Sequence, residues 1–114
     1  MKKLVIFGSG GHAKVIFSEV MKLRKFQFLG FVDDFKIKGE LVVRLNNKNF
    51  YNLGNIKQVI NDNKKINGII GVGLNRIRKK IVKDINKIDK NFKFKKIVSK
   101  DAIVNSNVSL REEL

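Results

Sequence analysis

The chain has 114 residues, 43% of them apolar, which suits one domain with a single hydrophobic core. It contains no cysteine, which excludes disulfide and thiolate chemistry, and no apolar run approaches the ~18 residues that a membrane-spanning helix requires. The net charge of +15 is spread evenly along the sequence, and dispersed charge gives only a non-specific field, which argues against nucleic acid as the main partner.

The chain begins with a predicted strand over residues 2–8, a glycine turn and a helix from about 11 to 24. The apolar run meets the turn too early to be the core of a signal peptide, so we expect a cytoplasmic protein. The helical period predicts that the apolar face of the helix carries Val15, Ile16, Val20 and Leu23.

The glycine turn carries the first candidate site. Gly8, Gly10 and Ala13 fit the G-x-G-x-x-G/A spacing of dinucleotide-binding folds. The first glycine permits the turn, the second lets the backbone approach a phosphate, and the small third residue lets helix and strand pack closely. The alternative is an ordinary glycine-rich turn between a strand and a helix.

A second strand is predicted over residues 27–32, and it ends at Asp33 and Asp34. Acidic residues at this distance beyond the glycines accept ribose hydroxyl protons in Rossmann folds. The alternative is a solvated turn at an exposed strand end, and for that reason we expect Asp33→Ala to change stability little. Lys36 and Lys14 are candidates to contact phosphate.

Residues 35–53 show no clear period, with one candidate for a short strand at Leu41–Val43. Residues 46–49 are predicted to form a turn or loop. A helix is expected over 53–63, with three buried residues, Ile56, Val59 and Ile60.

The Asn67-Gly68 pair predicts a turn before a strand over residues 69–72. The following Gly71–Asn75 segment predicts a second glycine turn whose N–H groups face the same edge of the sheet. Asn75 either contacts a ligand or caps the next helix, and capping is the better interpretation of its side chain.

The last helix is predicted from about Asn75 to Ile88, with Ile77, Ile81, Ile85 and Ile88 on one side and basic residues on the other. A strand over residues 92–98 follows. Strands that alternate with helices predict an α/β fold, a Rossmann-like and mostly parallel sheet with helices on both faces. Ligands bind such sheets at the carboxyl ends of the strands.

His12 is the one histidine of the sequence, and near a helix start it more often orients a ligand than acts as a catalyst. No cysteine, second histidine or group of carboxylates at ligand spacing accompanies it. We therefore predict no metal site.

Three segments in this order resemble the N-terminal domain of bacterial sugar acetyltransferases of the PglD-like and sialic-acid O-acetyltransferase kind. They are residues 8–13 (GSGGHA), 31–36 (FVDDFK) and 72–81 (VGLNRIRKKI), and the resemblance extends over about residues 2 to 110. It implies a Rossmann-like domain that binds a nucleotide-linked amino sugar. A left-handed β-helix follows in that family, where it binds acetyl-CoA and carries the catalytic histidine.

The resemblance also implies roles for individual residues. The substrate would be held by Ser9, Gly10, Gly11, His12, Asp33, Asp34, Lys36, Gly73 and Asn75. Leu74 stands where many members have a polar residue, and Ser99-Lys100 stands where a His-Pro pair is common. No catalytic residue and no cofactor are expected in this chain, and acetyl-CoA is expected only for the complete enzyme.

The resemblance divides the chain into a nucleotide-sugar-binding domain at 1–100 and the start of a β-helix at 101–114. Residues 102–110 look like the first coil of that helix, and a lone coil cannot cover its apolar face. We therefore expect this segment to be disordered or packed against another copy of the chain. A shortened chain of this kind is expected to transfer no acetyl group by itself.

Two other functions remain open from the sequence. One is a small NAD- or CoA-binding regulatory module, since the glycine spacing also suits those ligands. The other is a nucleic-acid binder that relies on dispersed charge, and steep salt dependence of DNA binding would identify it.

Overall fold

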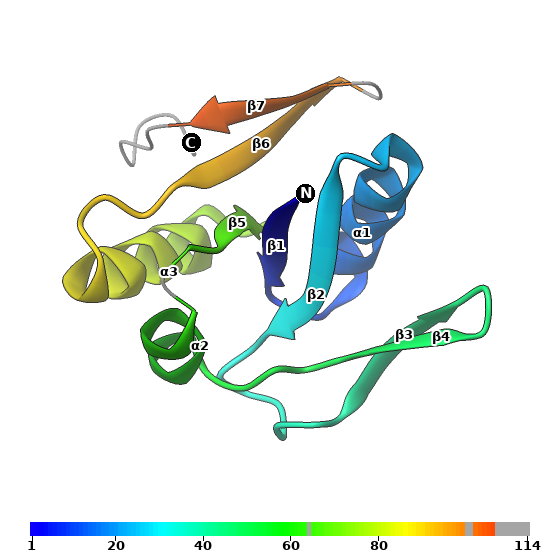
Figure 1. Ribbon diagram of the computed structural model, residues 1–114. Helices are drawn as coiled ribbons and strands as arrows, with labels where there is room; N and C mark the ends of the chain where they lie inside the picture. Colours follow the sequence, from blue (N-terminus) through cyan, green and yellow to red (C-terminus); the bar gives the residue numbers. More distant parts are fainter. Residues whose placement is uncertain (64, 100–101, 107–114) are drawn as a thin grey trace.

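The computed structural model describes residues 1–63, 65–99 and 102–106 (Figure 1). A five-stranded sheet has the order β2-β1-β5-β6-β7. Its strands are β1 (Lys2–Phe7), β2 (Phe26–Val32), β5 (Asn67–Ile70), β6 (Phe94–Ser99) and β7 (Ala102–Ser106). The pairs β1–β2, β1–β5 and β5–β6 are parallel, and β6–β7 is antiparallel. The predicted mostly parallel α/β sheet is confirmed.

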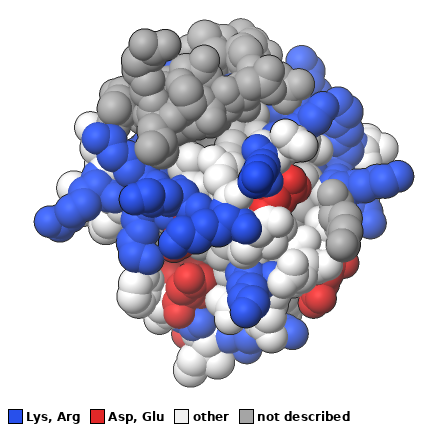
Figure 2. All heavy atoms as spheres, turned by 90° about the vertical axis from the view of Figure 1, so that its left-hand side faces the viewer, with Lys and Arg blue, Asp and Glu red and all other residues white. Residues whose placement is uncertain are grey.

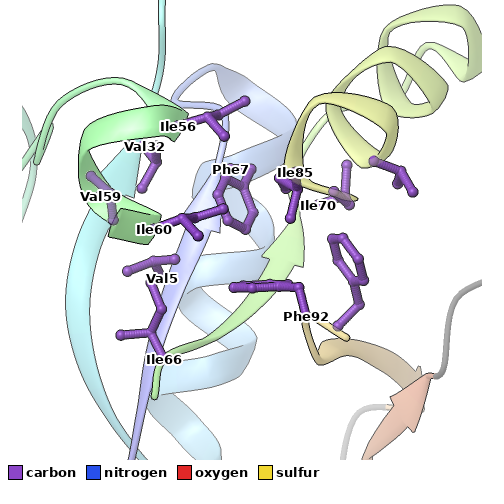
Figure 3. Packing of buried hydrophobic residues seen from close by; sticks show 12 residues of the cluster. Val5, Phe7, Val32, Ile56, Val59, Ile60, Ile66, Ile70, Ile85 and Phe92 are labelled. Atoms are coloured by element: carbon purple, nitrogen blue, oxygen red, sulfur yellow. The ribbon is translucent and has the colours of Figure 1, made fainter. Parts of the chain in front are cut away.

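Helices cover both faces of this sheet, as expected. The side chains of β1 alternate between the two faces, as a pleated strand requires. On one face, Val5 and Phe7 pack with buried residues of α2 (Ile56–Asp62) and α3 (Asn75–Ile88), which point toward one another in Figure 3. On the other face, Leu4 and Ile6 pack against α1 (Gly11–Leu23).

The apolar face of α1 differs in part from the prediction. Ala13, Phe17 and Val20 are its buried residues, whereas Val15 is 64% exposed. The cause is Phe17, whose ring lies 5.1 Å from that of Phe50 and 5.2 Å from that of Phe28. An aromatic ring buries more area than a valine, so it turns the helix to bring its own side toward the sheet.

The two later helices begin at different signals. α2 starts at Ile56 and not at Leu53, because Asn55 caps it and accepts a hydrogen bond of 2.8 Å from the N–H of Gln58. α3 has the predicted bounds, but its N-cap is Leu74. The prediction that the side chain of Asn75 caps this helix is therefore wrong.

The segment between β2 and α2 contains a hairpin that the sequence reading only partly found. The hairpin joins β3 (Leu41–Leu45) to β4 (Lys48–Tyr51), so the candidate strand is confirmed, and the loop predicted over 46–49 is too long. Asn46 and Asn47 have φ of 51° and 66°. Two positive φ values are characteristic of the tight turn that matches strand twist, and asparagine tolerates them.

The turn predicted at Asn67-Gly68 is wrong, because both residues belong to β5. A Cβ at Gly68 would overlap the ring of Phe7 and lie 3.0 Å from that of Phe92. Glycine is therefore required there by close aromatic packing and not by a turn. The asparagine side chain is used as well, since its Nδ2 donates to the carbonyl of Lys3 (3.2 Å).

The predicted strand over 92–98 is β6, which begins two residues later. Residues 102–106 pair with β6 of the same chain, so the expectation of disorder is wrong for this part. The alternative expectation, packing against another copy of the chain, stays a prediction. Residues 107–110 lie outside the described residues. Across the described ranges, no helix combines the length and apolarity needed to cross a bilayer.

Candidate functional site

The glycine turn is fixed between the ends of three parallel strands. The N–H of Gly8 donates to the carbonyl of Val32 at the end of β2 (2.8 Å), and the N–H of Gly71 donates to that of Phe7 at the end of β1 (2.7 Å). Gly8 has φ of +108°, and a Cβ there would lie 2.9 Å from Cγ2 of Val72. The turn therefore needs glycine at this position for both space and conformation.

The small third residue of the motif also has a visible reason. A Cβ added to Gly71 would lie 3.0 Å from Cβ of Ala13 and 2.6 Å from Cγ2 of Ile6. The start of α1 thus packs directly on the backbone at the end of β5. A larger residue on either side would push the helix away from the sheet.

Gly10 and Gly11 face open space, since a Cβ at either would meet none of the described atoms within 4 Å. Gly10 is the N-cap of α1, and no described side chain caps this helix. The N–H groups of the first turn therefore keep their capacity to bind an anion, which the helix dipole favours.

Asp33 links the glycine turn to the loop after β2. Its Oδ2 accepts a hydrogen bond from Oγ of Ser9 (2.5 Å), and its Oδ1 accepts one from the N–H of Phe35 (2.9 Å). The residue is half-buried. The alternative of a solvated turn, and the expectation that Asp33→Ala changes stability little, are thus at odds with these contacts.

The neighbouring Asp34 has a structural contact too. Its Oδ1 accepts a hydrogen bond of 2.8 Å from the N–H of Ile56, the first residue of α2. This carboxylate supports an otherwise orphaned helix N–H, a position where negative charge is favoured.

Asn52 binds the backbone of the loop after β2, and the sequence analysis did not identify it. It is 1% exposed, and its Oδ1 accepts from the N–H of Asp33 (3.0 Å) while its Nδ2 donates to the carbonyls of Lys36 (3.0 Å) and Ile37 (3.3 Å). No sequence pattern marked Asn52, because only the fold shows that its amide is buried and must find partners within the protein.

These segments surround a cleft of about 510 Å³ at the carboxyl ends of β1, β2 and β5. It brings together seven of the predicted site residues, namely Ser9, Gly10, Gly11, His12, Asp33, Asp34 and Gly73. Lys36 and Asn75 are not among its described lining residues. His12 is exposed, and a Cβ at Gly73 would lie 3.9 Å from its Nδ1.

Part of the cleft lining is apolar, which the sequence analysis did not predict. Phe35 is 92% exposed, Leu74 61% and Ile77 36%, and all three line the cleft. Ile77 belonged to the predicted apolar side of α3, but the buried residues of this helix, Val82 and Ile85, lie in its later turns.

Charge on the surface is divided into separate groups. Figure 2 shows the side where α3 lies, with lysine and arginine side chains in clusters between uncharged and acidic regions. At the cleft, Nζ of Lys80 lies 3.0 Å from Oδ2 of Asp84, and both residues line it. In the described part of the chain, no three histidine, aspartate or glutamate side chains gather as a metal site would require.

Comparison with known families gives a match over most of these elements. The model of the PglD N-terminal domain family matches residues 3–85, which include the glycine turn, the Asp33 loop and most of α3. The chain belongs to this family. The predicted resemblance is therefore confirmed.

Solved structures agree with this assignment. The acetyltransferase domain of PglB from Neisseria gonorrhoeae FA1090, in complex with acetyl coenzyme A, is 26% identical, with a TM-score of 0.58 over 81% of this chain and 41% of that one. A second structure of the same domain gives 26% identity and a TM-score of 0.57 over 82% of this chain and 42% of that one. Our PglD-family chain thus spans about two fifths of each. No curated protein matches it.

Proposed function

We propose that this PglD-family domain binds a nucleotide-linked amino sugar and presents it for acetylation. The observation that carries the proposal is the cleft at the strand ends, which is lined both by the open backbone at Gly10 and Gly11 and by the carboxylate of Asp33. The glycine backbone suits a diphosphate, and the carboxylate suits hydroxyl or amine groups.

The diphosphate is assigned to the glycine turn. Backbone N–H groups at a helix start bind phosphate well, and the absence of a Cβ at Gly10 leaves room for its oxygens. His12, which is exposed in the first turn of α1, is positioned to donate a further hydrogen bond.

The sugar is assigned to Asp33. An ionised carboxylate has about four acceptor positions, and Ser9 and Phe35 use two here. The remaining positions can accept hydroxyl or ammonium hydrogens of the sugar. Lys36 and Asn75 stay outside the proposed contacts, since neither is a described lining residue of the cleft.

The acetyl donor is proposed to be acetyl-CoA, since one solved relative is in complex with it. In this chain the domain would hold the sugar so that its amine or hydroxyl can attack the thioester. We place the reaction in the cytoplasm, in the biosynthesis of cell-surface glycans.

The experiment is Gly10→Val with a ligand panel of a UDP-amino sugar, CMP-sialic acid, NAD and acetyl-CoA. Gly10 has an ordinary φ of −86°, and a Cβ there meets none of the described atoms, so the variant should fold. We expect the parent to bind a nucleotide sugar in a calorimetric titration and the variant to lose at least about tenfold in affinity, or 1.4 kcal/mol.

Ser18→Val is the control, because it adds a similar side chain to an exposed position of the same helix outside the described cleft lining. Equal affinity of Gly10→Val and parent would refute the assignment of the diphosphate. Preference for NAD or free acetyl-CoA would instead support a regulatory module.

A further inference from the structure

We infer that Phe35 and the exposed start of α3 form a clamp for the nucleobase, in which the Phe35 ring stacks on the flat face of the base. This inference rests on the proposed function and assigns the remaining part of the ligand. The clamp consists of Phe35, in the loop after β2, together with Leu74 and Ile77 at the start of α3, and all three line the same cleft.

The exposure of these side chains is the first reason. Single exposed apolar residues are common, but here Phe35, Leu74 and Ile77, exposed by 92%, 61% and 36%, line one cleft. Apolar patches that border a polar pocket are typical of ligand sites, because the ligand removes them from water.

The position of Phe35 is fixed by the same carboxylate that contacts the glycine turn. Its N–H donates to Oδ1 of Asp33 (2.9 Å), whose Oδ2 accepts from Ser9 (2.5 Å). Asn52 holds the carbonyls of the next two residues, at 3.0 and 3.3 Å. The ring is therefore carried on a backbone that is tied to the phosphate-binding turn and needs little reordering on binding.

The chemistry of the clamp selects the base over the other parts of the ligand. A diphosphate requires N–H groups and a sugar requires polar partners, and both are offered at the glycine turn and Asp33. The wall at Leu74 and Ile77 offers neither, whereas every nucleobase has a flat face that stacks on an aromatic ring. Lys80 and Asp84 lie beside this wall and can meet the polar edge of a base.

The chain contains no tryptophan, so Phe35→Trp creates a single fluorescent reporter in the clamp. We expect its emission to change on addition of the UDP-sugar and to stay constant on addition of inorganic pyrophosphate. Ile37→Trp is the matched control. It lies in the same loop and is 75% exposed, but it is not a described lining residue of the cleft, so its emission should not respond to either compound.

Phe35→Ala gives the affinity. We expect about tenfold weaker binding of the UDP-sugar, unchanged binding of pyrophosphate and an unchanged melting temperature, because the ring is almost fully exposed. Ile37→Ala should leave all three values at those of the parent.

The inference fails if Phe35→Ala binds the UDP-sugar as the parent does while Gly10→Val does not, and the proposed function then stands. If Gly10→Val also keeps full affinity, the proposed function fails as well. A Phe35→Trp signal that changes with protein concentration and not with nucleotide would show that another copy of the chain covers the clamp, and would overturn it.

Discussion

The contact between Ser9 and Asp33 joins two segments that lie 24 residues apart, so its loss should weaken the whole strand-end edge of the sheet. Asp33→Ala removes two acceptors. A hydrogen bond to a charged group contributes about 1.5–3 kcal/mol, and the low end applies to this partly buried pair. The N–H of Phe35 is exposed and can turn to water, so its bond adds only about 0.5 kcal/mol.

We therefore expect Asp33→Ala to lower the free energy of unfolding by about 2 kcal/mol, and the melting temperature by about 8 °C for a domain of this size. Ser9→Ala should cost about 1.5 kcal/mol, because it removes one of the same bonds. The double variant should then cost about as much as Asp33→Ala alone, which gives a coupling energy of about 1.5 kcal/mol.

Urea denaturation followed by circular dichroism measures all four proteins, and an unchanged slope with denaturant would show that the unfolded states are comparable. Glu40→Ala is the control, since this exposed carboxylate should cost less than about 0.5 kcal/mol. Additive losses, with coupling below about 0.3 kcal/mol, would refute the view that this hydrogen bond links the glycine turn to the loop after β2.

Two further predictions concern other parts of the fold. Gly71→Ala should lower the free energy of unfolding by about 1–3 kcal/mol in the same urea assay, because its Cβ would lie 2.6 Å from Cγ2 of Ile6. Gly73→Ala is the control and should be neutral, because its Cβ would meet its nearest described atom at 3.9 Å. Burial, with smaller effects from the charges of Lys2 and Lys93, lowers the pKa of Lys95 below its ordinary value of 10.5. At pH values between that lowered pKa and 10.5, Lys95 is protonated in the unfolded chain but not in the folded one. The free energy of unfolding should therefore rise with pH more steeply in the parent than in Lys95→Met. Parallel stability profiles of the two proteins from pH 8 to 10.5 would contradict this.

Much of the fold could be predicted because helical and strand periods are local properties. α3 was predicted with its bounds, since its isoleucines repeat at helical spacing. The errors arose where tertiary contacts decide. Asn67-Gly68 has the composition of a turn, but packing against Phe7 and Phe92 makes it a strand.

The polar half of the candidate site could be predicted for a similar reason. Glycine turns and strand-end acids fall at fixed places in a parallel α/β sheet, so Gly10 and Asp33 were found. Phe35 and Leu74 were not predicted as site residues, because the sequence alone does not show whether an apolar side chain packs in the core or lines a cleft. Asn52 was missed because no hairpin was predicted, and without the hairpin the contact of Asn52 with the loop after β2 could not be foreseen.

The strand position of Asn67-Gly68 has a further, chemical consequence. Asparagine followed by glycine deamidates readily in flexible chains. The backbone nitrogen of the glycine attacks the side-chain amide carbon and displaces ammonia, and water then opens the resulting ring to aspartate or isoaspartate. Here the amide nitrogen of Asn67 donates to Lys3 and the N–H of Gly68 donates to Lys93 (3.3 Å), within the interior of a parallel sheet. Deamidation at this pair should therefore require β5 to detach from its neighbouring strands. Its rate would then report how often the centre of the sheet opens.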